Sequence, residues 1–357
     1  MLDDNNLRMK EKIVYLEFLR VLCAIVVVLD HICIAGIHIW EANASEFDKF
    51  FYNGVQHWSH FAVPVFLMIS GYLLLSPQRP IDYKKAITKY AWRMIVVLLT
   101  VGTIFAWMEI YFKTKSFAPS GLLLALWNTI QGDTWKHLWY LYTLVGVYLV
   151  LPVLKPFFEK LTVRDLDVFL GISFFFGSIM PTLSSLTSFK LGVTFPICSI
   201  YLFYFMMGRR IGVLETDRRT KRYFSISVFG VLSCVSFICA YFEYYKNQNV
   251  VECLTTYSSP IIVFAGISFF YMMKSLDSYL VKCYCGGANK LIRHISLNSF
   301  GIYVFHMLWV NILYKVVKFN PLEYGLWILL PMLIVLLVAS DITTSIFRKI
   351  PFVGKFI

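Results

Sequence analysis

Long apolar runs separated by short polar segments dominate this chain of 357 residues. A helix needs about 20 mainly apolar residues to cross the hydrocarbon core of a bilayer, within a range of about 17–25. Ten stretches approach this length, and we expect spans at residues 13–37, 58–76, 90–112, 138–157, 167–184, 197–214, 223–243, 255–275, 294–318 and 322–346. The pattern predicts an all-α integral membrane protein in which about ten transmembrane helices form a single bundle.

The basic residues between these runs indicate the orientation, because Lys and Arg accumulate in cytoplasmic loops. With the N-terminus placed inside, the inside segments hold 24 of the 33 Lys and Arg residues, the outside segments hold 8, and Arg20 lies within a span. We therefore expect both termini to be cytoplasmic. The apolar stretch 121–130 is too short to span, which predicts an interfacial or re-entrant helix.

Composition supports the same class, since 58% of the residues are hydrophobic and only 15% are charged, against about a quarter charged in soluble domains. The net charge of +12 comes mostly from basic residues in the segments expected to be cytoplasmic. We therefore expect membrane lipids as partners and no nucleic acid. Neither a linker nor a low-complexity segment divides the chain, which predicts one domain over residues 1–357. We expect an uncleaved first span, a multi-pass location in the cell membrane, and an assembly that is either a monomer or a homo-oligomer.

The first expected span contains four ionisable residues, namely Glu17, Arg20, Asp30 and His31. Each costs about 2.5–3.5 kcal/mol at membrane depth on insertion scales, so such groups are usually functional. Arg20 and His31 are 11 residues apart, so on a helix they share one face, about 16 Å apart along the axis. Glu17 lies on nearly the same stripe, whereas Asp30 is rotated by about 100° and is not expected to be a same-face partner of His31.

Two interpretations of this stripe remain open. In the first, Glu17 and Arg20 form a structural ion pair near the cytoplasmic interface, and His31 hydrogen-bonds a neighbouring helix. In the second, the stripe lines a cavity, with a fixed cation nearer the cytoplasm and a titratable imidazole deeper in the membrane.

Two further segments carry polar groups into expected spans. In HWSHFAVPVFLMISGYLLLS, residues 57–76, the pair Ser70-Gly71 permits close approach of a helix or a ligand. In residues 79–94, Lys85, Lys89 and Arg93 are spaced at i, i+4 and i+8 on one helix face. That face suits anionic lipids or a phosphorylated cytoplasmic ligand.

Two later segments combine aromatic residues with histidine. HLWYLYTLVGVYLVLP, residues 137–152, fits either an aromatic belt at the membrane interface or a wall that faces a sugar. In NSFGIYVFHMLWV, residues 298–310, His306 is either a cavity residue or a hydrogen-bonded packing group.

Together these segments resemble acyltransferase family 3, whose members O-acylate cell-surface glycans. That family has an Arg followed eleven residues later by His, matched by Arg20 and His31. Its other motifs are matched by PVFLMISGY at 64–72, HLWYL at 137–141 and SFGIYVFH at 299–306. Where members often carry an Arg-rich element before the third span, this chain has KKAITKYAWR, so the side chain that binds each phosphate is left open.

The resemblance implies an acyl-CoA donor, with acetyl-CoA as co-substrate, a hydroxyl of a surface or lipid-linked glycan as acceptor, and neither a cofactor nor a metal. Because imidazole titrates near operating pH, we assign His31 as general base or transient acyl carrier. Arg20 would position the donor or stabilise the oxyanion, and Glu17 would orient Arg20.

The remaining assignments concern the two substrates. The residues expected to bind CoA are Lys85, Lys89 and Arg93. The residues expected in the cavity or at the acceptor are Ser70, Tyr72, Trp139, Tyr140 and His306. A glycan permease or flippase that makes no bonds is the alternative function, because the same polar stripe suits a transport pathway.

Overall fold

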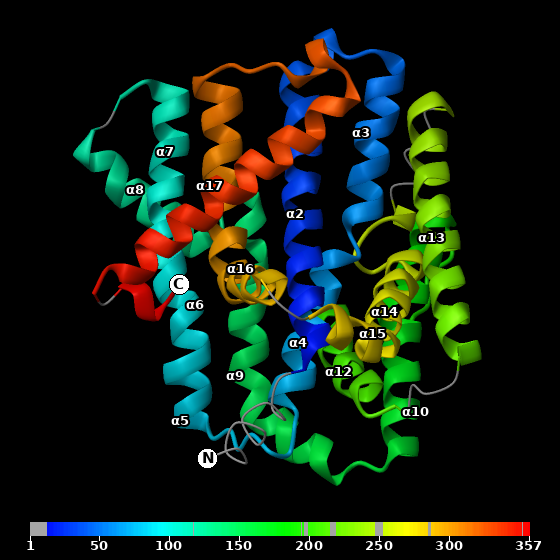
Figure 1. Ribbon diagram of the computed structural model, residues 1–357. Helices are drawn as coiled ribbons and strands as arrows, with labels where there is room; N and C mark the ends of the chain where they lie inside the picture. The colour runs from blue at the N-terminus through cyan, green and yellow to red at the C-terminus, as the bar shows by residue number, and fades with distance from the viewer. Residues whose placement is uncertain are drawn as a thin grey trace.

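The computed structural model describes residues 13–116, 118–193, 195, 199–214, 219–246, 253–284, 287–351 and 353–357. These residues form helices and connecting segments, and no β-strand occurs among them. Most helices stand side by side in one bundle (Figure 1). Helix α2 (Val14–Trp40) runs through this bundle and contacts helices from both halves of the chain.

The long helices are accompanied by shorter and interrupted ones. The α-helices after α2 are α3 (Glu46–Ser59), α4 (Ala62–Leu74), α5 (Tyr83–Lys85), α6 (Trp92–Val97), α7 (Thr103–Thr114), α8 (Pro119–Gln131), α9 (Trp139–Lys160), α10 (Val163–Phe174), α11 (Met180–Leu186), α12 (Ile200–Gly212), α13 (Arg219–Lys246), α14 (Pro260–Ser275), α15 (Asp277–Cys283), α16 (Gly287–Asn311) and α17 (Leu329–Lys349). The π-helical segments η2 (Ala86–Ala91), η3 (Leu98–Gly102), η5 (Phe175–Ile179) and η7 (Ile312–Val316) continue α-helices. Short 3₁₀ turns are η1 (Glu41–Asn43), η4 (Lys136–Leu138), η8 (Pro321–Tyr324), η9 (Leu326–Ile328) and η10 (Val353–Lys355).

Within the described residues, 7 helical stretches are long and apolar enough to cross a membrane. The count becomes 8 if α14 and α15, which are bent by 59° at a break, form one span. The expected spans 58–76 and 197–214 contain α4 and α12, which have 13 residues each and are too short to cross alone. The all-helical membrane class is confirmed, while the count of ten, the single domain and the cytoplasmic termini stay predictions.

The stretch 121–130 is helical, as expected, and lies within α8. With 13 residues, α8 is also below spanning length, and it lies beside α7 at one edge of the bundle (Figure 1). Its interfacial or re-entrant position stays a prediction.

Glycines bring the two short helices α4 and α12 into direct backbone contact. A Cβ atom on Gly71 would lie 1.6 Å from the carbonyl oxygen of Phe205, and one on Gly208 would lie 1.9 Å from the carbonyl oxygen of Met68. Both glycines are therefore required for this crossing, because any side chain would separate the helices. Of the two partners expected to approach the Ser70-Gly71 pair, a helix or a ligand, it is the helix α12 that packs against Gly71.

Lysines from neighbouring helices cap the C-terminal ends of α4 and α12. Lys155 Nζ donates to the carbonyls of Leu74 at 3.2 Å and Ser76 at 2.7 Å, and also to that of Arg79. Lys274 Nζ donates to three carbonyls at the end of α12, those of Ile211, Gly212 and Leu214, at 3.0, 2.8 and 2.5 Å. Because the last four carbonyls of a helix lack intrahelical partners, these ammonium groups allow both helices to end inside the bundle.

Candidate active site

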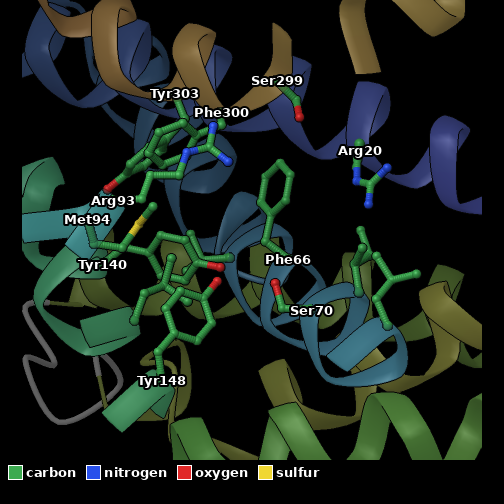
Figure 2. Close-up of a pocket in the computed structure, with 14 residues that line it drawn as sticks. Arg20, Phe66, Ser70, Arg93, Met94, Tyr140, Tyr148, Ser299, Phe300 and Tyr303 are labelled. Carbon is green, nitrogen blue, oxygen red and sulfur yellow. The ribbon is translucent and has the colours of Figure 1, made fainter. Parts of the chain in front are cut away.

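A cavity of about 220 Å³ lies between α2, α4, α6, α9 and α16 (Figure 2). Two guanidinium groups face it from opposite sides, those of Arg20 and Arg93. The other polar lining residues carry hydroxyl groups: Ser70, Tyr140, Tyr148, Ser299 and Tyr303. The cavity therefore combines positive charge with neutral hydrogen-bonding groups and has no carboxylate in its lining.

Arg20 is half-buried on α2 and, among the described residues, has neither a hydrogen bond nor an ion pair. Glu17, its expected partner, instead accepts a hydrogen bond from the hydroxyl of Tyr284. Burial and this contact with Glu17 raise the pKa of Tyr284 to about 12, so the phenol keeps the proton that it donates. Glu17 and Arg20 thus form no ion pair, and Arg20 faces the cavity with neither a hydrogen bond nor an ion pair to any described residue.

Arg93, the other cation in the cavity, is held by the end of the chain. Its Nε donates to the main-chain oxygen of Phe356 at 3.0 Å, its Nη2 donates to a main-chain oxygen of Ile357 at 2.7 Å, and its guanidinium lies 4.6 Å from the ring centroid of Phe300. These two bonds use two of its five N–H donors. Arg93 therefore has donors left for a ligand.

Lys85 and Lys89, predicted with Arg93 to bind CoA, do not line the cavity. Lys85 Nζ donates to the carbonyl of Pro80 at 2.9 Å, and Lys89 is exposed. The expected i, i+4, i+8 stripe assumed a regular α-helix, but the π-helical segment η2 lies between Lys85 and Arg93. Its i→i+5 hydrogen bonding changes the rotation per residue, and of these three residues Arg93 alone lines the cavity, while a role for the lysines in CoA binding stays a prediction.

Three histidines from three separate elements cluster next to the cavity. The ring centroid of His31 on α2 lies 4.8 Å from that of His306 on α16 and 6.1 Å from that of His137 on η4. The centroids of His137 and His306 are 5.1 Å apart. We placed His306 among the cavity candidates from sequence, but expected His137 either in an aromatic belt or in a wall that faces a sugar, and did not name it as a site residue. The sequence signal that could have identified His137 as a site residue is its position as the first residue of the HLWYL motif.

One ring nitrogen of each histidine donates to a main-chain carbonyl. For His31 it is Nδ1, 2.8 Å from the oxygen of Val27, and for His306 it is Nδ1, 2.7 Å from that of Tyr303. For His137 it is Nε2, 3.2 Å from the oxygen of Val304. A carbonyl only accepts, so in a neutral imidazole the other nitrogen carries a lone pair. Each ring thus keeps one nitrogen that is able to accept a proton.

Two tyrosines of the cavity lining lie near the histidine cluster. Tyr303 lines the cavity, its ring lies 5.7 Å from that of His137, and its hydroxyl donates to the carbonyl of His137. Tyr140, also in the lining, has its ring centroid 5.6 Å from that of Tyr303. Arg20 and His31 lie on the continuous helix α2, about 16 Å apart along its axis, so the cavity and the cluster occupy successive levels along it.

Asp30 contacts His31, which corrects our expectation from helix rotation. Its Oδ2 lies 3.5 Å from Nδ1 of His31, and its Oδ1 accepts a hydrogen bond of 2.7 Å from the hydroxyl of Ser59 on α3. The helical angle of about 100° separates the Cα–Cβ directions of neighbouring residues. It does not prevent two flexible side chains from bending toward each other.

The other predicted acceptor residues are divided between the cavity and its surroundings. Ser70 and Tyr140 line the cavity. Tyr72 lies outside it, with its ring 6.3 Å from that of Tyr15. Trp139 also lies outside, with ring centroids 5.4 Å from Tyr201 and 5.0 Å from Tyr257.

A second cavity, of about 590 Å³, lies between α10, α12, α13 and α14. Its lining is mainly apolar and includes the ion pair between Arg210 and Asp167, whose N–O distances are 2.6 and 2.9 Å. None of the predicted site residues lines it. The smaller cavity is therefore the candidate active site, because it is the one that the predicted site residues line.

Across the described ranges, no group of three or more His, Cys, Asp or Glu side chains is arranged to hold a metal ion, the histidine cluster included. Comparison with known proteins assigns the chain to a family over most of its length. The family model described as an acyltransferase domain matches residues 13–344. No curated protein and no solved structure matches the chain. With its long apolar helices, the chain is a multi-pass membrane protein and belongs to acyltransferase family 3.

Proposed function

We propose that the protein transfers an acetyl group from cytoplasmic acetyl-CoA to a hydroxyl of a cell-surface or lipid-linked glycan at the cell membrane. The observation that carries this proposal is Arg20, which among the described residues has neither a hydrogen bond nor an ion pair and faces a cavity one level along α2 from the histidine cluster. A buried charge is stable only when it is paired. An anionic substrate supplies the missing partner, and the clustered imidazoles supply a base.

The distance between Arg20 and His31 divides their roles. A group that stabilises an oxyanion has to lie within hydrogen-bond distance of it. The separation of about 16 Å along α2 excludes this role for Arg20 if the oxyanion forms at His31. Arg20 instead binds the donor at a distance from the reacting thioester, together with Arg93 on the opposite side of the cavity.

The cavity volume indicates which part of the donor it holds. At about 220 Å³ it is smaller than the sites of about 300–1,000 Å³ that enclose whole drug-sized ligands. We assign the pyrophosphate and the adjacent part of the pantetheine arm to this cavity, because two guanidinium groups suit phosphate oxygens. The arm extends along α2 toward His31, and the adenosine end lies outside, toward Lys85 and Lys89.

The chemistry then takes place at Nε2 of His31. The acceptor oxygen forms a bond to the thioester carbonyl carbon while its proton passes to Nε2. The carbon–sulfur bond breaks, and the imidazolium returns the proton to the departing thiolate, so the products are the ester and free CoA. A positioned base of this kind contributes about 10²- to 10⁴-fold to the rate.

Incubation of the purified protein with labelled acetyl-CoA and a glycan acceptor tests the proposal. We expect labelled glycan from the wild type and none from His31→Ala, while His38→Ala, an exposed histidine on the same helix, stays active. A permease neither binds nor consumes acetyl-CoA. Absence of both binding and consumption in the wild type would therefore overturn the proposed function.

A further inference from the structure

We propose that Asp30, held by Ser59, is the positioning residue that makes His31, of the three clustered histidines, the general base. This inference rests on the proposed function. The family motif that contains Arg20 and His31 does not name Asp30. Because Asp30 directly precedes His31 in the helix, we did not expect it to be a same-face partner of that histidine.

The three imidazoles are similar in hydrogen bonding but differ in charge environment. In the described part of the chain, His31 is the one of the three with a carboxylate within 4 Å. His137 and His306 are 4% and 0% exposed and have no acidic partner among those residues. A proton accepted by either would create an unpaired buried charge, which is costly. A proton accepted by His31 creates an ion pair with Asp30.

Asp30 also lacks a permanent cation as partner. Its side chain is 13% exposed and that of His31 is 20% exposed. None of the described Lys or Arg side chains lies within 4 Å of it. The titratable groups that face it from the surrounding elements are His60 and Tyr257, both half-buried. Protonated His31 is therefore the counter-charge that this carboxylate lacks in the resting site.

Ser59 holds the carboxylate in place. Its hydroxyl is 3% exposed and lies 2.7 Å from both Oδ1 of Asp30 and the carbonyl oxygen of Gln56. The hydroxyl has one proton, and an ionised carboxylate is the stronger acceptor. The donation to Asp30 fixes Oδ1 and leaves Oδ2 directed at the ring of His31.

The same geometry determines which nitrogen of His31 reacts. Its Nδ1–H already donates to the carbonyl of Val27 at 2.8 Å, while Oδ2 of Asp30 lies 3.5 Å from that nitrogen. Nε2 is thus left free for the acceptor hydroxyl. Asp30 acts on the transition state through its charge, because the imidazolium forms only during the transfer and a fixed nearby anion favours it.

Replacement of the charge at constant shape tests this role. Asp30→Asn keeps an oxygen for Ser59 but removes the anion. We expect kcat to fall by about 10- to 100-fold, with the KM for acetyl-CoA and its binding affinity unchanged, because the donor cavity is not altered. Asp30→Glu, which restores the anion, should recover part of kcat. Asp133→Asn, which removes an exposed carboxylate elsewhere, is the matched control and should leave kcat unchanged.

The role proposed for Asp30 is tested by the following outcomes. Wild-type kcat in Asp30→Asn, with activity still abolished in His31→Ala, would overturn the inference, as would an equal loss of acetyl-CoA binding and of kcat. If Asp30→Asn does not fold, Ser59→Ala decides, since it frees the carboxylate without removing it. A lower kcat at constant KM then supports the proposal, and an unchanged kcat refutes it. An inactive wild type would instead contradict the proposed function.

Discussion

Substitution of Arg20 should change the stability and the activity of the protein in opposite directions. A structural arginine stabilises the fold, whereas an arginine that waits for a ligand is a cost to the fold when the ligand is absent. In this protein the half-buried guanidinium has no partner among the described residues. We therefore predict that Arg20→Met raises the stability of the ligand-free protein while it abolishes acyl transfer.

The magnitude follows from the desolvation of the charge. Exchange of buried ionic groups for well-packed apolar ones often stabilises by about 1–4 kcal/mol. Because Arg20 is half-buried and faces a cavity, we expect the lower part of this range, about 1–2 kcal/mol. For the wild type, acetyl-CoA at 100 times its Kd should add about 2.7 kcal/mol, and this increment should vanish in the variant.

Thermal unfolding of the detergent-solubilised protein, with and without acetyl-CoA, measures both effects. Arg164→Met, an exposed arginine at the start of α10, is the control and should keep the acetyl-CoA increment. An apo Arg20→Met protein that unfolds at a lower temperature than the wild type would refute the reasoning, since Arg20 would then be structural. Retention of the full acetyl-CoA increment would remove Arg20 from the donor site.

Three further predictions concern packing, capping and the donor. Gly71→Ala should destabilise by at least about 1–3 kcal/mol, because its Cβ would lie 1.6 Å from a carbonyl oxygen of α12; Gly146→Ala, inside α9 and with nothing within 4 Å of its Cβ, should leave the unfolding temperature the same or higher, because alanine favours helix. Lys274→Met should cost at least about 3 kcal/mol, since hydrogen bonds to charged groups contribute about 1.5–3 kcal/mol each and three carbonyls at the end of α12 lose the ammonium group, although that of Ile211 keeps the Leu214 N–H; a wild-type unfolding midpoint would contradict this capping role. Lys85→Gln combined with Lys89→Gln should raise the KM for acetyl-CoA, with a smaller effect at high salt because exposed charges are screened; an unchanged KM would place the adenosine end elsewhere.

Much of the fold class could be predicted from local properties of the sequence. The length and apolarity of residues 13–37 identify a helix of membrane-spanning size, and α2 occupies Val14–Trp40. The spacing of Arg20 and His31 is likewise a local quantity, since one continuous helix carries both. The motifs that resemble acyltransferase family 3 also depend on short-range order alone, and the family match over residues 13–344 confirms the family.

Local periodicity fails where the helix is irregular or too short. The stripe expected for Lys85, Lys89 and Arg93 assumed 3.6 residues per turn, and η2 breaks that assumption. Hydropathy also counted α4 and α12 as spans, although each has 13 residues. An apolar run indicates that a segment lies away from water, in the protein interior or in lipid. It does not show whether the helix formed by that segment crosses the bilayer.

The composition of the site was decided by tertiary structure alone. His137 joins His31 and His306 because three elements distant in sequence pack together. Glu17 bonds to Tyr284, 267 residues away, in place of the neighbouring Arg20. These choices depend on which side chains face each other across helix contacts. Sequence determines the surface of each helix, whereas the pairing of surfaces results from the packing of the whole bundle.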